Sequence, residues 1–332
     1  MISTKNKLVS VIIPTWNSAG TLPRCLEALL AQTFQDFEVI VVDNGSRDGC
    51  VDDLEKRYPG LELSLEKLEE NRGFAAANNL AARLAQGEWL ALLNADAYPD
   101  PEWLECLLDA VQRLPEIDSF ASRLIQADRP ELLDGEGDEY HFSGLAWRRN
   151  HGKPVTTLTQ EQEVFSSCGA ACLLRKEAFL QAGGFDETYF AYNEDVDLGF
   201  RLHLTGHRCV IIPNARVLHV GSASTGRGSD TAIYYGHRNL VWTFFKDMPT
   251  GLLILLFPSH LAMTCAYALY FLITGKISTF WRAKRDAFRQ LPRIWGLRNI
   301  VQSTTTISMR SVFSLFNTSL LLKHWVTRLV PS

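Results

Sequence analysis

Residues 8–14, LVSVIIP, form an unbroken apolar run that is rich in β-branched side chains. Such a run is typical of a strand covered on both faces, because a half-exposed strand alternates apolar and polar residues. The next segment, AGTLPRCLEALLAQ at residues 19–32, carries leucines at positions 22, 26, 29 and 30, which is helical spacing. The chain therefore opens with a buried strand and an amphipathic helix.

The same alternation continues along the chain. FEVIVVDNGSRDG (37–49) predicts a second strand that breaks at a turn, and CVDDLEKRY (50–58) predicts a short helix. LELSLEKL (61–68) predicts a third strand, GFAAANNLAARLAQG (73–87) a helix, and EWLALLNADAYPDP (88–101) a fourth strand running into a polar turn. Repeated βαβ units predict an α/β fold with a mostly parallel, Rossmann-like sheet.

Polar residues follow each of these four strands: Pro14–Asn17, Asp43–Asn44, Asn71–Gly73 and Asn94–Asp96. Each cluster alone is compatible with an ordinary turn. Ligands of such sheets, however, bind beyond the carboxyl ends of the strands. Four polar clusters at one edge therefore predict a binding site.

Composition indicates a folded, intracellular chain. At 46% hydrophobic and 21% charged, its 332 residues can bury a sizeable core. The seven cysteines are scattered without a CxxC pair, which favours reduced, buried thiols in the cytosol. The first apolar run is too short for the apolar core of a signal peptide, so we interpret it as a strand.

Charge and hydropathy set the C-terminal region apart. Residues 274–332 carry ten Lys or Arg and one acid, a net charge of +9 that leaves −13 for residues 1–273 out of the total of −4. GLLILLFPSHLAMTCAYALYFLI (251–273) has no formally charged residue and is long enough to cross a bilayer. We therefore divide the chain into an α/β domain that carries the predicted binding site, 1–245, and a hydrophobic and basic helical membrane-associating region, 246–332.

A single crossing by residues 251–273 would place the basic segment 276–298 outside the cell, against the positive-inside tendency. The later run SVFSLFNTSLLL (311–322) is too short and polar for a return span. We therefore expect a re-entrant or interfacial hairpin, bent near Pro258–His260, at the cytoplasmic face of the inner membrane. A buried helical subdomain is the alternative. An acidic body without a recognised nucleic-acid-binding module argues against nucleic acid as a partner.

The second half of the chain holds a concentration of acids. After an irregular excursion at residues 126–165, YFAYNEDVDLGFRL (189–202) places Glu194, Asp195 and Asp197 within four positions. One interpretation is structural: Asn193 caps a helix whose first turn favours acids. The other is functional, and Glu194 and Asp197 would then orient acceptor or partner groups. HRCVIIPNARVLHVG (207–221) then predicts a pair of strands ending at His219.

The residue types at the predicted edge suit a nucleotide diphosphate. Asp43 can accept from a base or ribose hydroxyl, Arg72 can pair with phosphate, and Gly73 permits close approach of backbone to ligand. Asn94 and Asp96 lie on one face of an extended segment. Asp96 and His219 together suit a divalent cation, and the imidazole favours Mn²⁺ over Mg²⁺.

Six stretches occur in a fixed order: VSVIIPTWN (9–17), VIVVDNGSRDG (39–49), NRGFAAANN (71–79), LLNADAYPDP (92–101), GGFDETYF through LHVG (183–221), and HRNLVW (237–242). Together they resemble the inverting family 2 glycosyltransferases with a GT-A fold, especially rhamnosyltransferase-like members of surface-polysaccharide pathways. The resemblance covers residues 8–242. It implies a nucleotide-sugar donor, a divalent metal (Mn²⁺ or Mg²⁺) and a single displacement with inversion.

The resemblance also implies roles for particular residues. Glu194 and Asp195 match the catalytic-base motif, with Asp195 as the base. Asp96 matches the last carboxylate of the metal-binding DxD motif, whose first Asp is replaced by Asn94, and His219 matches a late metal-ligand histidine. The positions that match nucleotide-facing residues are Thr15, Asp43, Asn71, Arg72, Gly73 and Asn78.

We therefore expect transfer of a sugar from dTDP-L-rhamnose, or failing that a UDP-hexose, to a lipid-linked glycan of the polyprenyl diphosphate type. QLPRIW (290–295) misplaces the Trp of the QxxRW signature of processive synthases, so we expect addition of one or a few sugars. Two alternatives remain: a nucleotide-sugar-binding protein without turnover, and a nucleotidyltransferase that releases diphosphate.

Overall fold

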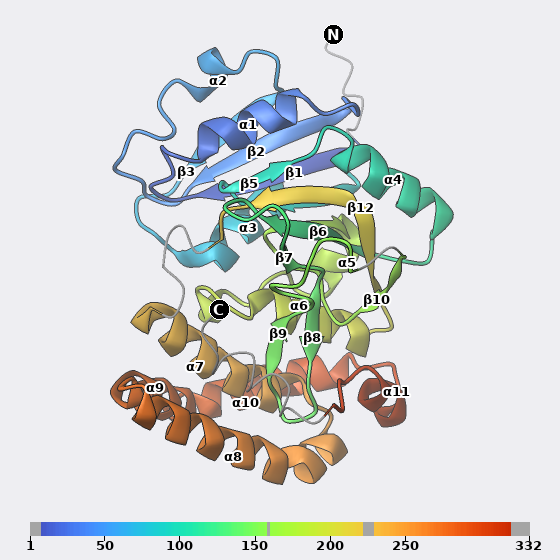
Figure 1. The fold of residues 1–332 in the computed structure, drawn as a ribbon. Helices are drawn as coiled ribbons and strands as arrows, with labels where there is room; N and C mark the ends of the chain where they lie inside the picture. Colours follow the sequence, from blue (N-terminus) through green and yellow to red (C-terminus); the bar gives the residue numbers. More distant parts are fainter. Residues whose placement is uncertain (1–7, 158–159, 222–228, 320–332) are drawn as a thin grey trace.

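The computed structural model describes residues 8–157, 160–221 and 229–319 (Figure 1). Its main sheet has the strand order β10-β12-β6-β11-β4-β1-β2-β3, with β5 paired to β12 and β7 paired to β6. The residues before Leu8 and after Ser319, which include part of the predicted C-terminal region, lie outside the described residues. The strands are β1 Val9–Thr15, β2 Phe37–Asp43, β3 Leu63–Lys67, β4 Trp89–Leu93, β5 Ala97–Pro99, β6 Ser119–Gln126, β7 Leu133–Gly135, β8 Asp138–Tyr140, β9 Ala146–Arg148, β10 Gln162–Val164, β11 Ala171–Arg175 and β12 Cys209–His219.

The parallel half of the sheet confirms the predicted βαβ alternation. Strands β3, β2, β1 and β4 are parallel neighbours, and β6 with β12 forms a further parallel pair. Strand β11 lies antiparallel between β4 and β6, which makes the complete sheet mixed. The fold is therefore α/β, with the four predicted strands in its parallel half.

The expected pair of strands at residues 207–221 is wrong. Cys209–His219 is one strand, β12, which runs parallel to β6 along its length. The register shifts between Ile212 and Arg216, where Pro213 lies. Because proline has no N–H to give to the ladder, it causes a bulge here rather than a chain reversal.

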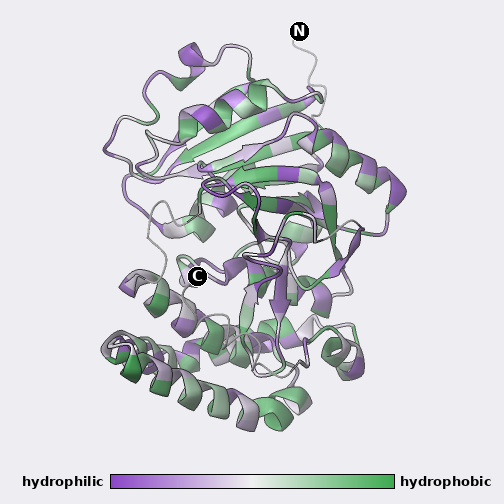
Figure 2. Cartoon of the chain, in the orientation of Figure 1, coloured by the Kyte–Doolittle hydropathy of each residue, from purple (hydrophilic) through white to green (hydrophobic). Residues whose placement is uncertain are grey.

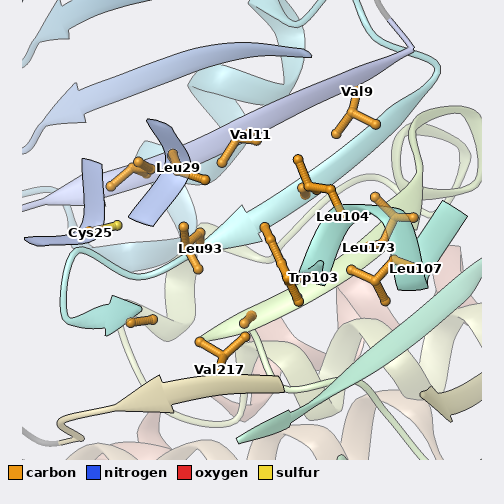
Figure 3. Packing of buried hydrophobic residues seen from close by; sticks show 14 of the residues in the cluster. Val9, Val11, Cys25, Leu29, Leu93, Trp103, Leu104, Leu107, Leu173 and Val217 are labelled. Carbon is orange, nitrogen blue, oxygen red and sulfur yellow. The ribbon is translucent and has the colours of Figure 1, made fainter. Parts of the chain in front are cut away.

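Both faces of the sheet are covered by helices, as the apolar run of β1 predicts. On one face, Cys25 and Leu29 of α1 (Leu22–Leu30) and Trp103 of α4 (Trp103–Arg113) pack with Val11 and Leu93 of the sheet (Figure 3). On the other face, apolar residues of α3 (Gly73–Leu84), α5 (Lys176–Gln181) and α6 (Glu194–Leu204) pack against β1, β2 and β4. The helix expected at residues 50–58 is reduced to α2, Leu54–Arg57.

The irregular excursion and the C-terminal helices form a second layer (Figure 1). A hairpin of β8 and β9 extends from the sheet toward the C-terminal helices. Tyr140 of β8 and Phe200 of α6 share one apolar cluster with Phe244, Leu253 and Val312. The predicted boundary between residues 245 and 246 thus crosses a shared core. These helices are α7 Asp230–Asp247, α8 Thr250–Ile273, α9 Ile277–Arg289, α10 Leu291–Ser303 and α11 Met309–Ser314.

The bend expected near Pro258–His260 is wrong, because α8 continues through Pro258 from Thr250 to Ile273. Proline removes one backbone hydrogen bond from a helix interior. Here Pro258 lies on the exposed side, and the packed side of α8 keeps the helix continuous. The chain reverses instead after Ile273, and α9 then returns beside α8.

Asp197 anchors α6 to α7 through buried charge, so of the acceptor or partner groups that it is expected to orient, it holds partner side chains. Its fully buried carboxylate accepts from Arg201 at 2.7 Å and pairs with Lys246, which also donates to Asp186 at 2.7 Å. Burial alone would raise the pKa of Asp197, but the Arg201 and Lys246 charges hold it far below its ordinary value. This ion pair therefore stabilises the fold above pH 4 and is lost as the pH falls well below that value.

Replacing Asp197 by Asn is expected to lower the free energy of unfolding by about 3–5 kcal/mol, because Arg201 loses its buried counter-charge and Lys246 keeps only Asp186. Urea unfolding followed by circular dichroism measures the change. Asp53→Asn is the matched control, since Asp53 pairs with Lys56 on the surface, and it should change stability by less than about 0.5 kcal/mol. Equal effects of the two variants would contradict the account.

Candidate active site

The carboxyl ends of β1 and β2 bring Thr15 and Asp43 together, as predicted. The two residues are directly opposite each other in the parallel register, and Asn44 N–H donates to Thr15 O at 2.8 Å. One carboxylate oxygen of Asp43 accepts from Ser46 N–H at 2.9 Å. The turn interpretation of Asp43 is therefore correct for this oxygen, and its contact with a nucleotide stays a prediction.

Residues 71–73 join this edge through Asn44. Its Nδ2 donates to Gly73 O at 3.0 Å, and its Oδ1 accepts from Arg72 N–H at 2.8 Å. The Asn71 side chain accepts from Gly73 N–H, and the Arg72 side chain is exposed. Gly73 has a φ of +88°, and a Cβ there would lie 2.5 Å from Phe190 O. Only glycine fits this position, and it brings the turn against the segment that precedes α6.

Asn78 is fully buried in α3, and its Nδ2 donates to Phe74 O at 2.9 Å, within the same helix. Its Oδ1 has no hydrogen-bond partner among the described residues. The contact of Asn78 with a nucleotide stays a prediction.

The segment Cys168–Ala170 links the Asn94–Asp96 motif to the predicted catalytic base. Asn94 N–H donates to Ala170 O at 2.9 Å, and the adjacent Gly169 N–H donates to Asp195 Oδ2 at 3.2 Å. Asn94 and Asp96 follow β4, whereas Asp195 lies in the first turn of α6. The two motifs, about a hundred positions apart in the sequence, therefore belong to one site.

His219 connects Asp96 to a residue that the sequence did not single out. Its Nε2 lies 3.4 Å from Asp96 Oδ1, and its Nδ1 lies 2.8 Å from Asp134 Oδ2. Burial alone would lower the pKa of His219, but hydrogen bonds to Asp134 and Asp96 outweigh it and raise the pKa. Asp134 is buried as well, and its hydrogen bonds with His151 and His219, together with the Arg148 charge, lower its pKa.

Arg148 extends this chain toward Asp195. Its Nη1 donates to Asp134 at 3.0 Å, and its Nε lies 3.7 Å from Asp138, which accepts from Ser166. Burial, and next the charge of Asp195, raise the pKa of Asp138 to about 8. Asp138 is therefore mostly protonated near neutral pH.

Sequence reasoning missed Asp134, Asp138 and Arg148, which all lie in the excursion at residues 126–165. The signal that could have found them is the acidic stretch DGEGDEY at 134–140, which is more acidic than an ordinary turn requires. Because this stretch forms β7 and β8, next to β6 and β9, it carries its acids into the interior.

Glu194 and Asp195 have different surroundings. Glu194 is buried, its Oε2 has no hydrogen-bond partner among the described residues, and burial followed by the charge of Asp195 raises its pKa. Asp195 is partly exposed and accepts from Gly169 N–H and its neighbour Val196 N–H. As predicted, Asn193 is the N-cap residue of α6 and acids fill the first turn. Its side chain makes no capping hydrogen bond, however, because Asn193 has a φ of 64° and donates to Gly236 O instead.

The backbone before α6 is held in place by α7. Phe190, Tyr192 and Asn193 all have positive φ, which is unfavourable for residues other than glycine. Asn239 Nδ2 lies within hydrogen-bond distance of three carbonyls of this segment, those of residues 189, 191 and 192, at 2.7–3.1 Å. Arg238 donates to the carbonyls of residues 188 and 189. These contacts give the HRNLVW stretch a physical role: it fixes the segment that carries Glu194 and Asp195.

The donor set at Asp96 and His219 suits a divalent cation in part. One carboxylate and one imidazole lie in contact, and Asp134 holds the far nitrogen of the imidazole, as carboxylates do beside metal-bound histidines. No group of three or more His, Cys, Asp or Glu side chains suited to a metal occurs in the described part of the chain. A bound ion would need further ligands, such as diphosphate oxygens.

Helices on both faces of the sheet and acidic motifs that meet beyond the carboxyl end of β4 are features of a GT-A glycosyltransferase fold. The chain belongs to glycosyl transferase family 2, whose family model matches residues 10–182. It is therefore an enzyme that transfers sugars, and this confirms the resemblance, the fold class and the enzyme class expected from the sequence.

A curated relative and two solved structures illustrate the similarity. The N-acetylglucosaminyl-diphospho-decaprenol L-rhamnosyltransferase of Mycobacterium tuberculosis (strain ATCC 25618 / H37Rv) is 31% identical over 271 residues, which cover 74% of this chain and 86% of that protein. S. aureus TarS 1–349 in complex with UDP-GlcNAc is 19% identical with a TM-score of 0.58, covering 93% of this chain and 90% of that chain.

The mannosyltransferase PcManGT from Pyrobaculum calidifontis, in complex with GDP-Man and Mn²⁺, is also 19% identical. Its TM-score is 0.54, and the match covers 94% of this chain and 86% of that chain. At these identities the two structures support the fold, and the rhamnosyltransferase relative supports the family.

Replacing Asn239 by Ala is expected to release the segment before α6, because three carbonyls lose their donor. At about 1 kcal/mol per hydrogen bond, stability should fall by about 2–3 kcal/mol. Chymotrypsin should then cut the variant at Tyr189, Phe190 or Tyr192 about tenfold faster, or more, than it cuts the wild type. Asn299→Ala on the exposed face of α10 is the control. Cleavage at the same rate in both variants would contradict the role of Asn239 in holding the segment before α6.

Proposed function

We propose that the protein is an inverting glycosyltransferase that moves a sugar from a nucleotide-sugar donor to a hydroxyl of a lipid-linked glycan. The first donor to test is dTDP-L-rhamnose, followed by UDP-hexoses. The observation that carries the proposal is the hydrogen-bonded link from Asn94 through Ala170 and Gly169 to Asp195. It holds a candidate base beside the position where the donor diphosphate would lie.

Asp195 is the general base of this proposal. It is partly exposed, whereas Glu194 and Asp138 are buried, and burial together with the charge of Asp195 raises the pKa of each of these carboxyl groups. Asp195 would take the proton of the acceptor hydroxyl while that oxygen attacks the anomeric carbon from the side opposite the nucleotide. A positioned general base contributes about 10²–10⁴-fold to a rate.

Asp96 and His219 would hold the divalent cation, with Asn94 beside them. When bound, such an ion stabilises the negative charge of the departing diphosphate. Asp134 would fix the ring orientation of His219 through Nδ1. At the other end of the edge, Thr15, Asp43 and residues 71–73 would bind the base, ribose and phosphates.

A polyprenyl diphosphate-linked acceptor is supported by the mycobacterial relative, whose name specifies N-acetylglucosaminyl-diphospho-decaprenol. We propose that the apolar and basic C-terminal region associates with the membrane, so that the enzyme acts at the cytoplasmic face of the inner membrane. Helix α8 is long and apolar enough to be a candidate span by length and composition alone.

Replacing Asp195 by Asn is expected to lower the transfer rate by about 10²–10⁴-fold while leaving donor affinity within about twofold, because the base acts on the acceptor. The assay combines a panel of nucleotide sugars, a polyprenyl diphosphate-linked acceptor and Mn²⁺, with the product read by mass spectrometry. Glu194→Gln is the matched control and should lose much less activity, since Glu194 is buried and burial raises its pKa, which disfavours the charged form that a base needs.

The same assay separates the alternatives. Release of nucleoside diphosphate supports sugar transfer, whereas release of pyrophosphate from a nucleoside triphosphate would indicate a nucleotidyltransferase. Donor binding by the wild-type chain without any product would indicate a binding protein. An Asp195→Asn variant with full activity would refute the assignment of the base.

Replacing Asp134 by Asn is expected to weaken Mn²⁺ binding in the presence of nucleoside diphosphate by about 10–100-fold, because His219 loses the carboxylate that orients it. Isothermal titration with Mn²⁺ measures this affinity directly. The exposed Asp128 provides the control variant Asp128→Asn, whose affinity should match the wild type. Unchanged affinity in folded Asp134→Asn protein would place the cation elsewhere.

A further inference from the structure

Helix α8 presents an apolar stripe to the outside of the molecule. Figure 2 shows hydrophobic residues along α8, on the side of the molecule away from the main sheet. Ile254 is 72% exposed, Leu261 51% and Ile273 77%. The exposed positions recur at helical spacing and are all uncharged: Ile254, Pro258, Leu261, Cys265, Leu269 and Leu272. A soluble helix would carry polar residues here, so this face indicates an interaction surface.

The opposite side of α8 is packed against the catalytic body. Leu253 and Leu256 belong to the cluster that includes Phe200 of α6. His260, near the middle of the helix, contacts Ser143 O through Nδ1 at 2.8 Å and stacks on Phe244 with ring centroids 4.1 Å apart. A transmembrane orientation would pull these partners into the hydrocarbon region, where unpaired backbone groups are costly. The structure therefore favours a helix that lies along a surface.

Aromatic and basic side chains border the apolar stripe. On α9, which packs beside α8, Trp281, Arg285 and Phe288 are exposed one helical turn apart, and Arg289 is 67% exposed. Trp295 of α10 is also exposed. Tryptophan favours the headgroup region of a bilayer, and each basic residue near an anionic leaflet adds attraction.

From these observations we infer that the face formed by α8 and the exposed side of α9 inserts into one leaflet of an anionic phospholipid membrane, with α8 parallel to the membrane plane. The charge pattern selects lipid over a second copy of the chain. Residues 248–332 hold one acid, Asp286, so two copies of this face would place like charges together.

The same packing fixes the active site relative to the membrane. Helix α7 packs against α9 and α10, and its Asn239 and Arg238 hold the backbone before Asp195. Insertion of α8 and α9 would therefore hold the catalytic segment at a constant height above the lipid. That this height places the catalytic segment near a lipid-linked acceptor rests on the proposed function, whereas the membrane insertion itself does not depend on it.

Vesicle flotation of the full chain, without donor or acceptor, tests the insertion. The protein should bind vesicles of phosphatidylcholine with 30% phosphatidylglycerol, a composition chosen for the experiment. The double variant Leu261→Glu with Leu269→Glu should lose binding by a hundredfold or more, on the order expected for two charges placed in an apolar interface. Leu180→Glu on α5, another exposed leucine, is the matched control and should bind like the wild type. Thermal unfolding confirms that each variant is folded.

The basic residues of α9 that lie beside the apolar stripe allow a second test. Arg285→Gln with Arg289→Gln should weaken binding to these vesicles by about thirtyfold and leave the weak binding to pure phosphatidylcholine unchanged. Equal binding of wild type and both double variants would overturn the inference. A dimer in solution that Leu261→Glu with Leu269→Glu dissolves would overturn it as well, since a second copy would then cover the face.

Orientation is tested with a cysteine at exposed Ser278, in a chain carrying Cys265→Ala. In intact spheroplasts of an expression host, a membrane-impermeant maleimide should label this cysteine only after permeabilisation, because both ends of α8 lie on the cytoplasmic side. Labelling without permeabilisation would show that α8 crosses the bilayer and would overturn the in-plane arrangement.

Discussion

The site depends on one guanidinium, that of Arg148, which lies between the buried carboxyl groups of Asp134 and Asp138. Asp134 leads through His219 to Asp96, and Asp138 lies beside Asp195. Asp138 is mostly protonated near neutral pH, whereas the Arg148 charge and the hydrogen bonds of the histidines keep the buried Asp134 ionised. Arg148 therefore allows the Asp96–His219 pair and the Asp195 carboxylate to occupy neighbouring positions. The β8–β9 hairpin carries Asp138 and Arg148, so it is part of the site.

Backbone connections support this arrangement from two sides. The segment at residues 168–170 links the end of β4 to Asp195, while Asn239 of α7 holds the unusual backbone that precedes it. Because α7 also carries the packing against α9 and α10, the C-terminal helices are continuous with the catalytic body and share its core. The chemistry and the surface that we assign to the membrane are therefore parts of one packed structure.

Periodicity could predict the parallel half of the sheet, since the apolar run of β1 is buried on both faces and Thr15 and Asp43 end adjacent strands. The relation of Asp96 to His219 was predicted from their residue types at the ends of strands, and the resemblance implied it as well. Two features depend on contacts between distant residues and could not be predicted: the burial of Asp134 and Asp138, and the continuous α8. In the first, strand pairing carries acids inward; in the second, packing of Leu253 and His260 outweighs the local effect of Pro258.

The central claim is that a single base, Asp195, acts opposite the departing nucleotide, and the anomeric configuration of the product tests it most directly. The product made from a donor of known anomer by the full chain, with an acceptor in detergent, can be examined by NMR through the one-bond coupling of the anomeric carbon to its proton. The account predicts a configuration opposite to that of the donor. A product that retains the donor configuration would require a second displacement and would contradict the account.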